Sequence, residues 1–205
     1  MAMAKRSVIA VLLAMAVLLL ACASSPAAAQ PGRVSITGVS LLGSGCPRAS
    51  PKATLSRDKK FVKVEFTNLL DVSVPARLVN RQKACTMTVG LSYPRGWKYT
   101  ATRFTVVGFV NLAAWQTARY SLRSYYQGGA TACNHMQLFS GGSKGLRNAV
   151  FAKDVCTSAA SSTCGTIRGL VCIVRVSINN QRNPRGRGTI KATNALSFSL
   201  AWSRC

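Results

Sequence analysis

Apolar and polar residues alternate along much of the chain with a period of two. The clearest example lies near the C-terminus, where alternate positions are Leu196, Phe198, Leu200 and Trp202. Small residues, mostly serine, stand between them. Because a β-strand turns successive side chains to opposite faces, this segment is predicted to be a strand with one buried face.

The same alternation predicts strands through most of the chain and no long helix. Further strands are expected at residues 34–41, 53–57, 62–67, 86–92, 98–110, 118–125 and 172–178. Turns rich in glycine and proline separate them at intervals typical of a sandwich. Such strands cannot all bury an apolar face in one flat sheet. The pattern therefore predicts an all-β fold, an antiparallel β-sandwich of the jelly-roll or immunoglobulin-like type.

Residues 128–166 are the least regular part of the chain. They are rich in glycine, serine and alanine and contain Cys133, Cys156 and Cys164. We expect a long irregular excursion on the surface, braced by disulfides, with a short helix near residues 146–153.

The N-terminal segment has the composition of a secretory signal peptide. Lys5 and Arg6 precede an uncharged apolar run over residues 7–23, and three alanines at 27–29 form a small-residue cleavage pattern. We expect residues 1–29 to be removed and residues 30–205 to form a single secreted domain. Two alternatives remain open: the run is a membrane anchor, or, in a bacterial host, Cys22 is lipidated.

The cysteines are predicted to form a disulfide framework. Of eight cysteines, Cys22 lies in the leader and seven follow it. Secreted chains use cysteine mainly for disulfides. Zinc is disfavoured because no C-x-x-C spacing occurs and His135 is the one histidine in the sequence. We therefore predict no metal and no cofactor. Seven is odd, so one thiol stays unpaired or joins another chain.

The charge is extreme for a chain of this length. Lysine and arginine total 27 against four acidic residues, a formal net charge of +23. Loss of Lys5 and Arg6 with the leader leaves about +21. A field of this sign concentrates anions near the surface. Outside the cell the expected partner is an anionic polysaccharide or an anionic membrane surface rather than nucleic acid. The simpler alternative is that the charge serves solubility.

Two basic segments are candidates for the binding of anions. The stronger is the segment at 182–187, where glycine and proline expose the backbone. Its guanidinium groups can donate paired hydrogen bonds to sulfate, carboxylate or phosphate; they belong to Arg182, Arg185 and Arg187. The second is a predicted turn that contains Lys59 and Lys60.

Aromatic side chains offer a second type of contact, stacking against sugar rings. Core packing is the simpler explanation for most of them, Trp97 and Trp202 included, because aromatic residues dominate cores. Trp115 differs because it lies in a predicted loop. Trp115 and the pair Tyr125 and Tyr126 are the candidates for glycan contact.

The sequence offers little for catalysis, and we predict no catalytic residue. Hydrolysis by paired carboxylates needs two acids that flank a bond, whereas Glu65 lies on the outward face of a predicted strand and Asp58 in a turn. A ribonuclease would use groups such as Glu65 and His135 for proton transfer. His135, however, lies in a segment without a recognisable catalytic motif.

Several residue groups, taken together, resemble a known family. They include Gly43-Ser44-Gly45-Cys46-Pro47, Tyr93-Pro94-Arg95-Gly96-Trp97 and the ending Leu200-Ala201-Trp202-Ser203-Arg204-Cys205. In order and spacing they are similar to the secreted proteins grouped as domain of unknown function 4360. The resemblance spans nearly all of the chain after the leader. It implies secretion, a β-rich domain and no assigned activity.

The resemblance also implies a disulfide pattern. Four family cysteines fall on Cys46, Cys85, Cys164 and Cys205. The bridges that follow are Cys46–Cys85 and Cys164–Cys205. Cys133, Cys156 and Cys172 are additions to the family pattern, as is the strong positive charge. We expect Cys133–Cys156 as a third bridge and Cys172, which shares the apolar row of its strand, as a buried free thiol.

These observations favour a non-enzymatic secreted binding protein or wall-associated protein. It would attach through its basic surface to an extracellular anionic polymer, an acidic or sulfated polysaccharide. A cationic, membrane-active defence protein is the alternative, and a secreted hydrolase such as a ribonuclease is less favoured.

Overall fold

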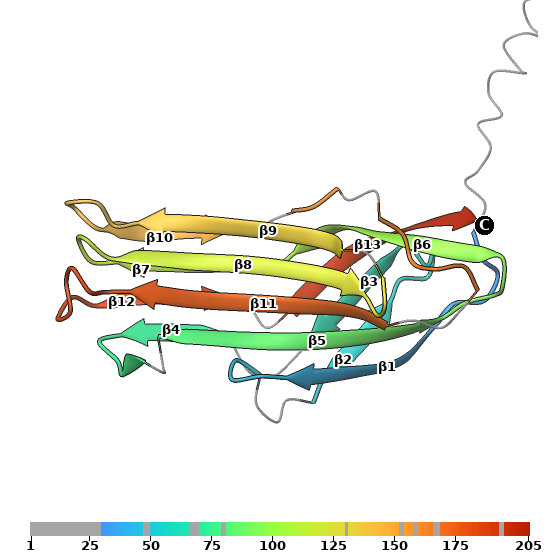
Figure 1. Ribbon diagram of the computed structural model, residues 1–205, viewed down its shortest axis with the longest axis horizontal. Helices are drawn as coiled ribbons and strands as arrows, with labels where there is room; N and C mark the ends of the chain where they lie inside the picture. Colours follow the sequence, from blue (N-terminus) through green and yellow to red (C-terminus); the bar gives the residue numbers. More distant parts are fainter. Residues whose placement is uncertain are drawn as a thin grey trace, which may run out of the picture. The chain divides into compact units, whose positions relative to one another are not determined.

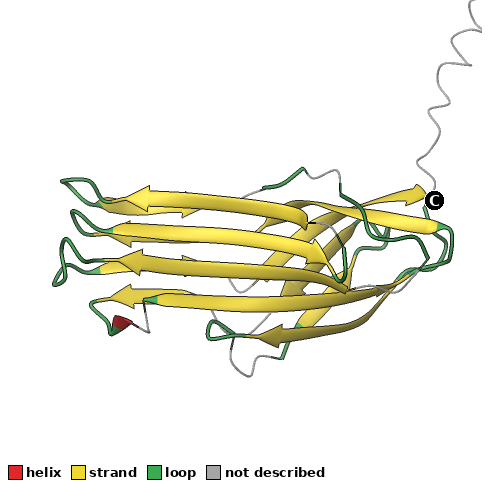
Figure 2. Cartoon of the chain, in the orientation of Figure 1, coloured by secondary structure: helices red, strands yellow, loops and turns green. Residues whose placement is uncertain are grey.

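Strands make up nearly all of the regular structure in the computed structural model (Figure 2). The structure describes residues 30–46, 50–65, 70–78, 81–129, 131–151, 154–157, 160–165, 169–192 and 195–205. Within these ranges there are 13 strands and no α-helix. The predicted signal peptide, residues 1–29, lies outside the described residues.

One layer is a five-stranded antiparallel sheet built from the longest strands (Figure 1). Its order is β1 (Ser35–Leu42), β5 (Gln82–Ser92), β11 (Gly169–Asn179), β8 (Thr117–Tyr126) and β9 (Thr131–Ser140). The predicted apolar row of β11 is buried, at Cys172, Val174, Val176 and Ile178. Arg175, between them, is exposed.

Two four-stranded antiparallel sheets form the second layer, behind the five-stranded sheet in Figure 1. One has the order β10 (Leu146–Phe151), β7 (Gly108–Leu112), β12 (Gly188–Ala192) and β4 (Asp71–Val74). The other has the order β2 (Lys52–Leu55), β3 (Phe61–Glu65), β13 (Ala195–Arg204) and β6 (Trp97–Thr105). Buried side chains from all three sheets join in one core, which confirms the predicted β-sandwich.

The region predicted to be irregular is more regular than its composition indicated. β9 pairs with β8 along its length, and β10 pairs with β7. The short helix expected near residues 146–153 is wrong, because residues 146–151 form the strand β10, and residues 152–153 lie outside the described chain. Cross-strand pairing and the burial of Phe151 outweigh the weak local preference. Among the described residues of this region, turns occupy 128–129 and 141–145, and the longest irregular part follows β10, where Val155 forms an isolated bridge with Phe104.

Three disulfides brace the sandwich, and they are the three predicted bridges, Cys46–Cys85, Cys133–Cys156 and Cys164–Cys205. The first and third close separations of 39 and 41 residues. In the chain-entropy model, loops of this length each contribute about 3–4 kcal/mol to stability. Cys172 is free and fully buried, and burial raises the pKa of its thiol far above the usual range. It therefore stays a neutral thiol.

Candidate functional site

Four connections meet at one end of the sandwich, and we call this region the loop end. They are the described residues of 75–81, with 113–116, 141–145 and 180–187. Each joins a strand of the five-stranded sheet to a strand of the β10-β7-β12-β4 sheet. Because these strands are neighbours within their sheets, the four connections are neighbours too, at the left of Figure 1.

The loop end brings together two residues that the sequence named separately. The guanidinium carbon of Arg182 lies 5.0 Å from the ring centroid of Trp115. Trp115 remains 48% exposed, so about half of the residue is accessible to a ligand. A cation over an exposed aromatic ring stabilises by about 0.5–1 kcal/mol. The contact therefore places a cation and an aromatic face within one surface site.

Trp115 is held in an unusual backbone conformation. Its φ is 64°, in the left-handed region that large side chains rarely adopt. Its N–H donates to the carbonyl oxygen of Gly142 at 2.7 Å, which ties it to the β9–β10 connection. Strain of this kind persists where the surroundings impose it, and it concentrates at ligand sites. The indole is therefore presented outward by a fixed loop.

Gln116 explains how the loop is fixed, and sequence reasoning missed its role. The residue is fully buried. Its Oε1 accepts from the N–H of Ala113 at 3.1 Å, while its Nε2 donates to the carbonyl of Gly186 at 2.7 Å and to that of Asn183 at 3.2 Å. One amide thus links the β7–β8 connection to the basic β11–β12 connection.

Two further features tighten the same link. The Nδ2 of Asn183 donates to the carbonyl of Ala114 at 3.0 Å. A Cβ at Gly188 would lie 2.3 Å from the Oε1 of Gln116, so the close approach requires glycine there. The sequence gives one hint of this link. Gln116 directly follows Trp115, and the β11–β12 connection that it contacts contains glycine and asparagine.

The charged side chains of the loop end are all basic. The exposed basic residues of its connections are Arg77, Lys144, Arg182, Arg185 and Arg187. The four connections contain no aspartate or glutamate. Within the described chain, the one salt bridge is elsewhere, between Lys63 and Glu65. The loop end therefore has the charge and the donors to hold an anion.

The second basic segment lies on a different sheet. Lys59 and Lys60 are in the turn between β2 and β3. The ammonium group of Lys59 donates to the carbonyl of Gly32 at 2.5 Å, and its own carbonyl accepts from the indole of Trp202 at 2.7 Å. Lys59 is thus engaged inside the molecule, and the structure does not bring this turn to the loop end.

The two candidate tyrosines have opposite environments. Tyr126 is 1% exposed, and its hydroxyl accepts from the N–H of Ala101 at 2.8 Å and donates to the carbonyl of Ala160 at 3.2 Å. Burial raises its pKa to about 12. Tyr126 is therefore a core residue, which corrects its placement as a glycan contact. Tyr125 is half-buried and points to the outer face of the five-stranded sheet.

The residues considered for catalysis are not assembled into a site. Glu65 lies on β3, where the ammonium group of Lys63 at 2.6 Å lowers its pKa. His135 lies on β9 rather than in an irregular segment, half-buried with its ring 6.1 Å from that of Tyr120. The described residues contain no metal-binding cluster of His, Cys, Asp or Glu. Nor does any helix among them have the length and apolarity to cross a membrane.

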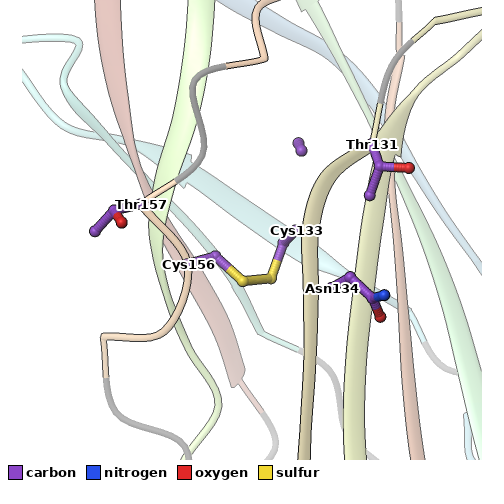
Figure 3. Close-up of a pocket in the computed structure, with 6 residues that line it drawn as sticks. Thr131, Cys133, Asn134, Cys156 and Thr157 are labelled. Carbon is purple, nitrogen blue, oxygen red and sulfur yellow. A yellow bond between two sulfur atoms is a disulfide. The ribbon is translucent and has the colours of Figure 1, made fainter.

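A shallow pocket lies at the Cys133–Cys156 disulfide (Figure 3). Its lining is neutral, and consists of Thr131, Ala132, Cys133, Asn134, Cys156 and Thr157. It offers hydroxyl and amide groups but no charged side chain, so it lacks the groups that would hold an anion.

Comparison with solved structures gives a likeness to TmCBM61, a carbohydrate-binding module in complex with beta-1,4-galactotriose. The two chains are 10% identical, with a TM-score of 0.22 over 82% of this chain and 90% of that one. A TM-score this low carries no argument about fold or ligand.

An uncharacterized secreted protein of Arthroderma benhamiae is 27% identical to this chain over 86 residues. The match covers 42% of this chain and 35% of that protein, so it spans about a third of the relative. The three disulfides also require an oxidising compartment. The protein is therefore secreted.

A family model matches residues 32–205, almost all of the chain after the predicted signal peptide. Its description is a domain of unknown function, DUF4360. The chain belongs to this family, as the motifs in its sequence indicated.

Proposed function

We propose that this member of the DUF4360 family is a non-enzymatic secreted protein whose loop end binds anionic polysaccharide. The observation that carries the proposal is the pair of Arg182 and Trp115, 5.0 Å apart and exposed among connections that contain no acidic residue. Such a pair offers two complementary contacts to one sugar unit.

The two contacts match the chemistry of an acidic or sulfated sugar. The indole presents a broad apolar surface on which the C–H face of a sugar ring can pack. The guanidinium groups of Arg182, Arg185 and Arg187 can donate paired hydrogen bonds to a carboxylate or sulfate on that ring. A neutral sugar would contact the indole alone, and a simple anion would contact the guanidinium groups alone.

The rigidity of the loops supports binding rather than turnover. The amide of Gln116 and the backbone bond of Trp115 fix three connections before a ligand arrives. A preorganised site loses less conformational entropy on binding. The large positive charge of the protein adds long-range attraction, which speeds the capture of a polyanion.

The test is retention on immobilised polygalacturonate and on immobilised heparin as salt rises, the two resins separating carboxylate from sulfate. The variant carries Arg182→Ala, Arg185→Ala and Arg187→Ala. A matched control carries Arg33→Ala, Arg57→Ala and Arg95→Ala, three exposed arginines outside the loop end. Both variants lose three charges. We expect the loop-end variant to elute at clearly lower salt than the control.

Equal elution of the two variants would show that net charge alone causes retention and would discard the loop-end site. Trp115→Ala adds a charge-neutral test, because it should also lower the salt needed for elution from the resins. Leakage of dye from anionic vesicles, without preference for either resin over a sulfonate exchanger, would favour a membrane-active protein instead.

A further inference from the structure

The outer face of the five-stranded sheet is basic and lacks acidic residues altogether. None of its strands, β1, β5, β11, β8 and β9, contains aspartate or glutamate. Arg119 and Arg123 on β8 and Arg175 on β11 are exposed on this face. The buried face of the same strands is apolar, so the charge is confined to one side of the sheet.

The strand register places these three arginines beside one another. Arg175 pairs with Ser121, the residue midway between Arg119 and Arg123 on β8. Arg175 is therefore the diagonal neighbour of both, and diagonal neighbours on one face are about 7–8 Å apart. β8 and β11 run side by side in Figure 1.

Nothing in the described structure compensates this cluster. No hydrogen bond or ion pair joins the three guanidinium groups to another described residue, and the acidic residues of the chain lie on other elements. Like charges placed together in this way are unfavourable in the free protein. A bound polyanion would remove the repulsion.

The side chains between the arginines are small and polar, so the face is hollowed around them. One shallow hollow is lined by Gln82, Arg119, Ser121, Arg175 and Ser177. A second continues toward the loop end and is lined by Thr117, Ala118, Arg119, Leu138, Ser177 and Asn179. Hydroxyl and amide groups thus accompany the guanidinium groups along the surface.

The cluster is continuous with the loop end. The last pair of this β8–β11 ladder, Thr117 with Asn179, leads directly into the connections that carry Trp115 and Arg182. At the other end of the row, Tyr125 lies on the same face as Arg123. From Arg123 to Thr117 the strand rises about 20 Å, at 3.3–3.4 Å per residue.

We infer that an extended acidic polysaccharide runs along β8, from the loop end across Arg119, Arg175 and Arg123 to Tyr125. This inference rests on the proposed function and extends it to a second subsite. The occupant is a long polyanion because the charges extend along β8 and the adjacent β11, beyond the reach of a short oligosaccharide bound at Trp115. Exposed apolar side chains on this face, Met136 and Leu138, lie on β9 beside the arginines, where they can pack against sugar rings.

The experiment compares long polygalacturonate with trigalacturonate by titration calorimetry. The variant carries Arg119→Gln, Arg123→Gln and Arg175→Gln, which keep polar side chains on the face. The control carries Arg33→Gln, Arg57→Gln and Arg95→Gln. We expect the sheet-face variant to lose roughly tenfold in affinity for the long polymer relative to the control, since exposed ionic contacts contribute a few tenths to 1 kcal/mol each. Its affinity for the trimer should change less than about twofold, because the loop end is intact.

Each outcome separates the two proposals. If the sheet-face variant and the control bind the polymer equally, the sheet-face subsite is wrong while the loop end stands. If the sheet-face variant loses the trimer as well, the assignment of the short ligand to the loop end is contradicted. If the loop-end variant binds both ligands as the control does, the proposed function itself fails. Thermal melts of all variants verify that they are folded.

Discussion

Two arginine–tryptophan pairs among the described residues are alike in chemistry and different in role. Arg204 lies 4.2 Å from the ring centroid of Trp97, and the two residues are directly opposite on β13 and β6. Trp97 is 5% exposed, in a strand. Trp115, beneath Arg182, is 48% exposed in a loop with a positive φ. The first pair closes the core, whereas the second leaves an aromatic face open.

The two layers of the sandwich differ in the same way. The acidic residues Asp58, Glu65 and Asp71 belong to strands or turns of the second layer, and Asp154 accepts a hydrogen bond from Thr105 of β6. There, basic groups such as Lys63 find partners. The five-stranded layer has basic residues and no acids. The two arginine–tryptophan pairs themselves differ in burial, with Trp97 inside the sandwich and Trp115 on its surface.

The largest expected effect tests the difference between the two tryptophans. Trp97→Ala should lower the free energy of unfolding by about 3–5 kcal/mol, because it removes a buried aromatic side chain. Trp115→Ala should lower it by only about 0.5–1 kcal/mol, the value of an exposed cation–π contact. Urea unfolding monitored by far-UV circular dichroism measures both. Equal losses would contradict the distinction.

Removal of the bridge between Cys164 and Cys205 should have the next largest effect. The double substitution to serine should lower stability by about 3–4 kcal/mol in the chain-entropy model. It should also free the C-terminus, where Arg204 precedes Cys205, and expose Trp97 to quenching by acrylamide. Retention on polygalacturonate should not change, since the loop end lies on other elements. A folded variant with weakened retention would show that the two regions are coupled.

Gln116→Ala tests whether the loop end is held by one buried amide. It leaves the carbonyl of Gly186 without the Nε2 donor, while the N–H of Ala113 keeps only its bond to the carbonyl of Arg187, and this should lower stability by about 1–3 kcal/mol. Retention on polygalacturonate should fall as well, because Trp115 and Arg182 are no longer held together. Unchanged retention in a destabilised variant would show that the pair does not depend on this link.

The smallest effect on stability is expected in the second layer of the sandwich, where acidic and basic residues are both present. The ammonium group of Lys63 holds the pKa of Glu65 below its usual value near 4.5. A lowered carboxyl pKa stabilises the folded state above the unfolded-state pKa, and this contribution disappears as the pH falls through the folded-state value. The stability difference between the native protein and Glu65→Gln should therefore be small near neutral pH and should decline as the pH falls below about 4.5. A difference that grows toward low pH would have the wrong sign.

The fold could be predicted from the sequence because the alternation of apolar and polar residues indicates which face of a strand is buried. β11 and β13 were predicted from their apolar rows alone. β9 and β10 were not, because their exposed residues include Met136, Leu138 and Val150, which obscure the alternation. Their pairing with β8 and β7 is a tertiary effect that local composition does not encode.

The site was accessible only in part. The sequence identified Trp115 as an aromatic residue in a loop and Arg182 as part of a basic segment, so both were candidates for ligand contact. Their meeting depends on two connections between the layers that lie far apart in the chain, and on the buried Gln116 between them. The burial of Tyr126, next to the half-exposed Tyr125, follows from the strand register, which fixes which of two adjacent side chains faces inward.

The free thiol of Cys172 can be used to measure how often the five-stranded sheet opens. Cys172 lies in β11, between β5 and β8, with no exposed surface. A thiol-reactive reagent can reach it only when this central strand separates from a neighbour, because the neutral buried thiol does not react in place. The rate of alkylation at this one position therefore measures how often the sandwich opens, without any engineered label.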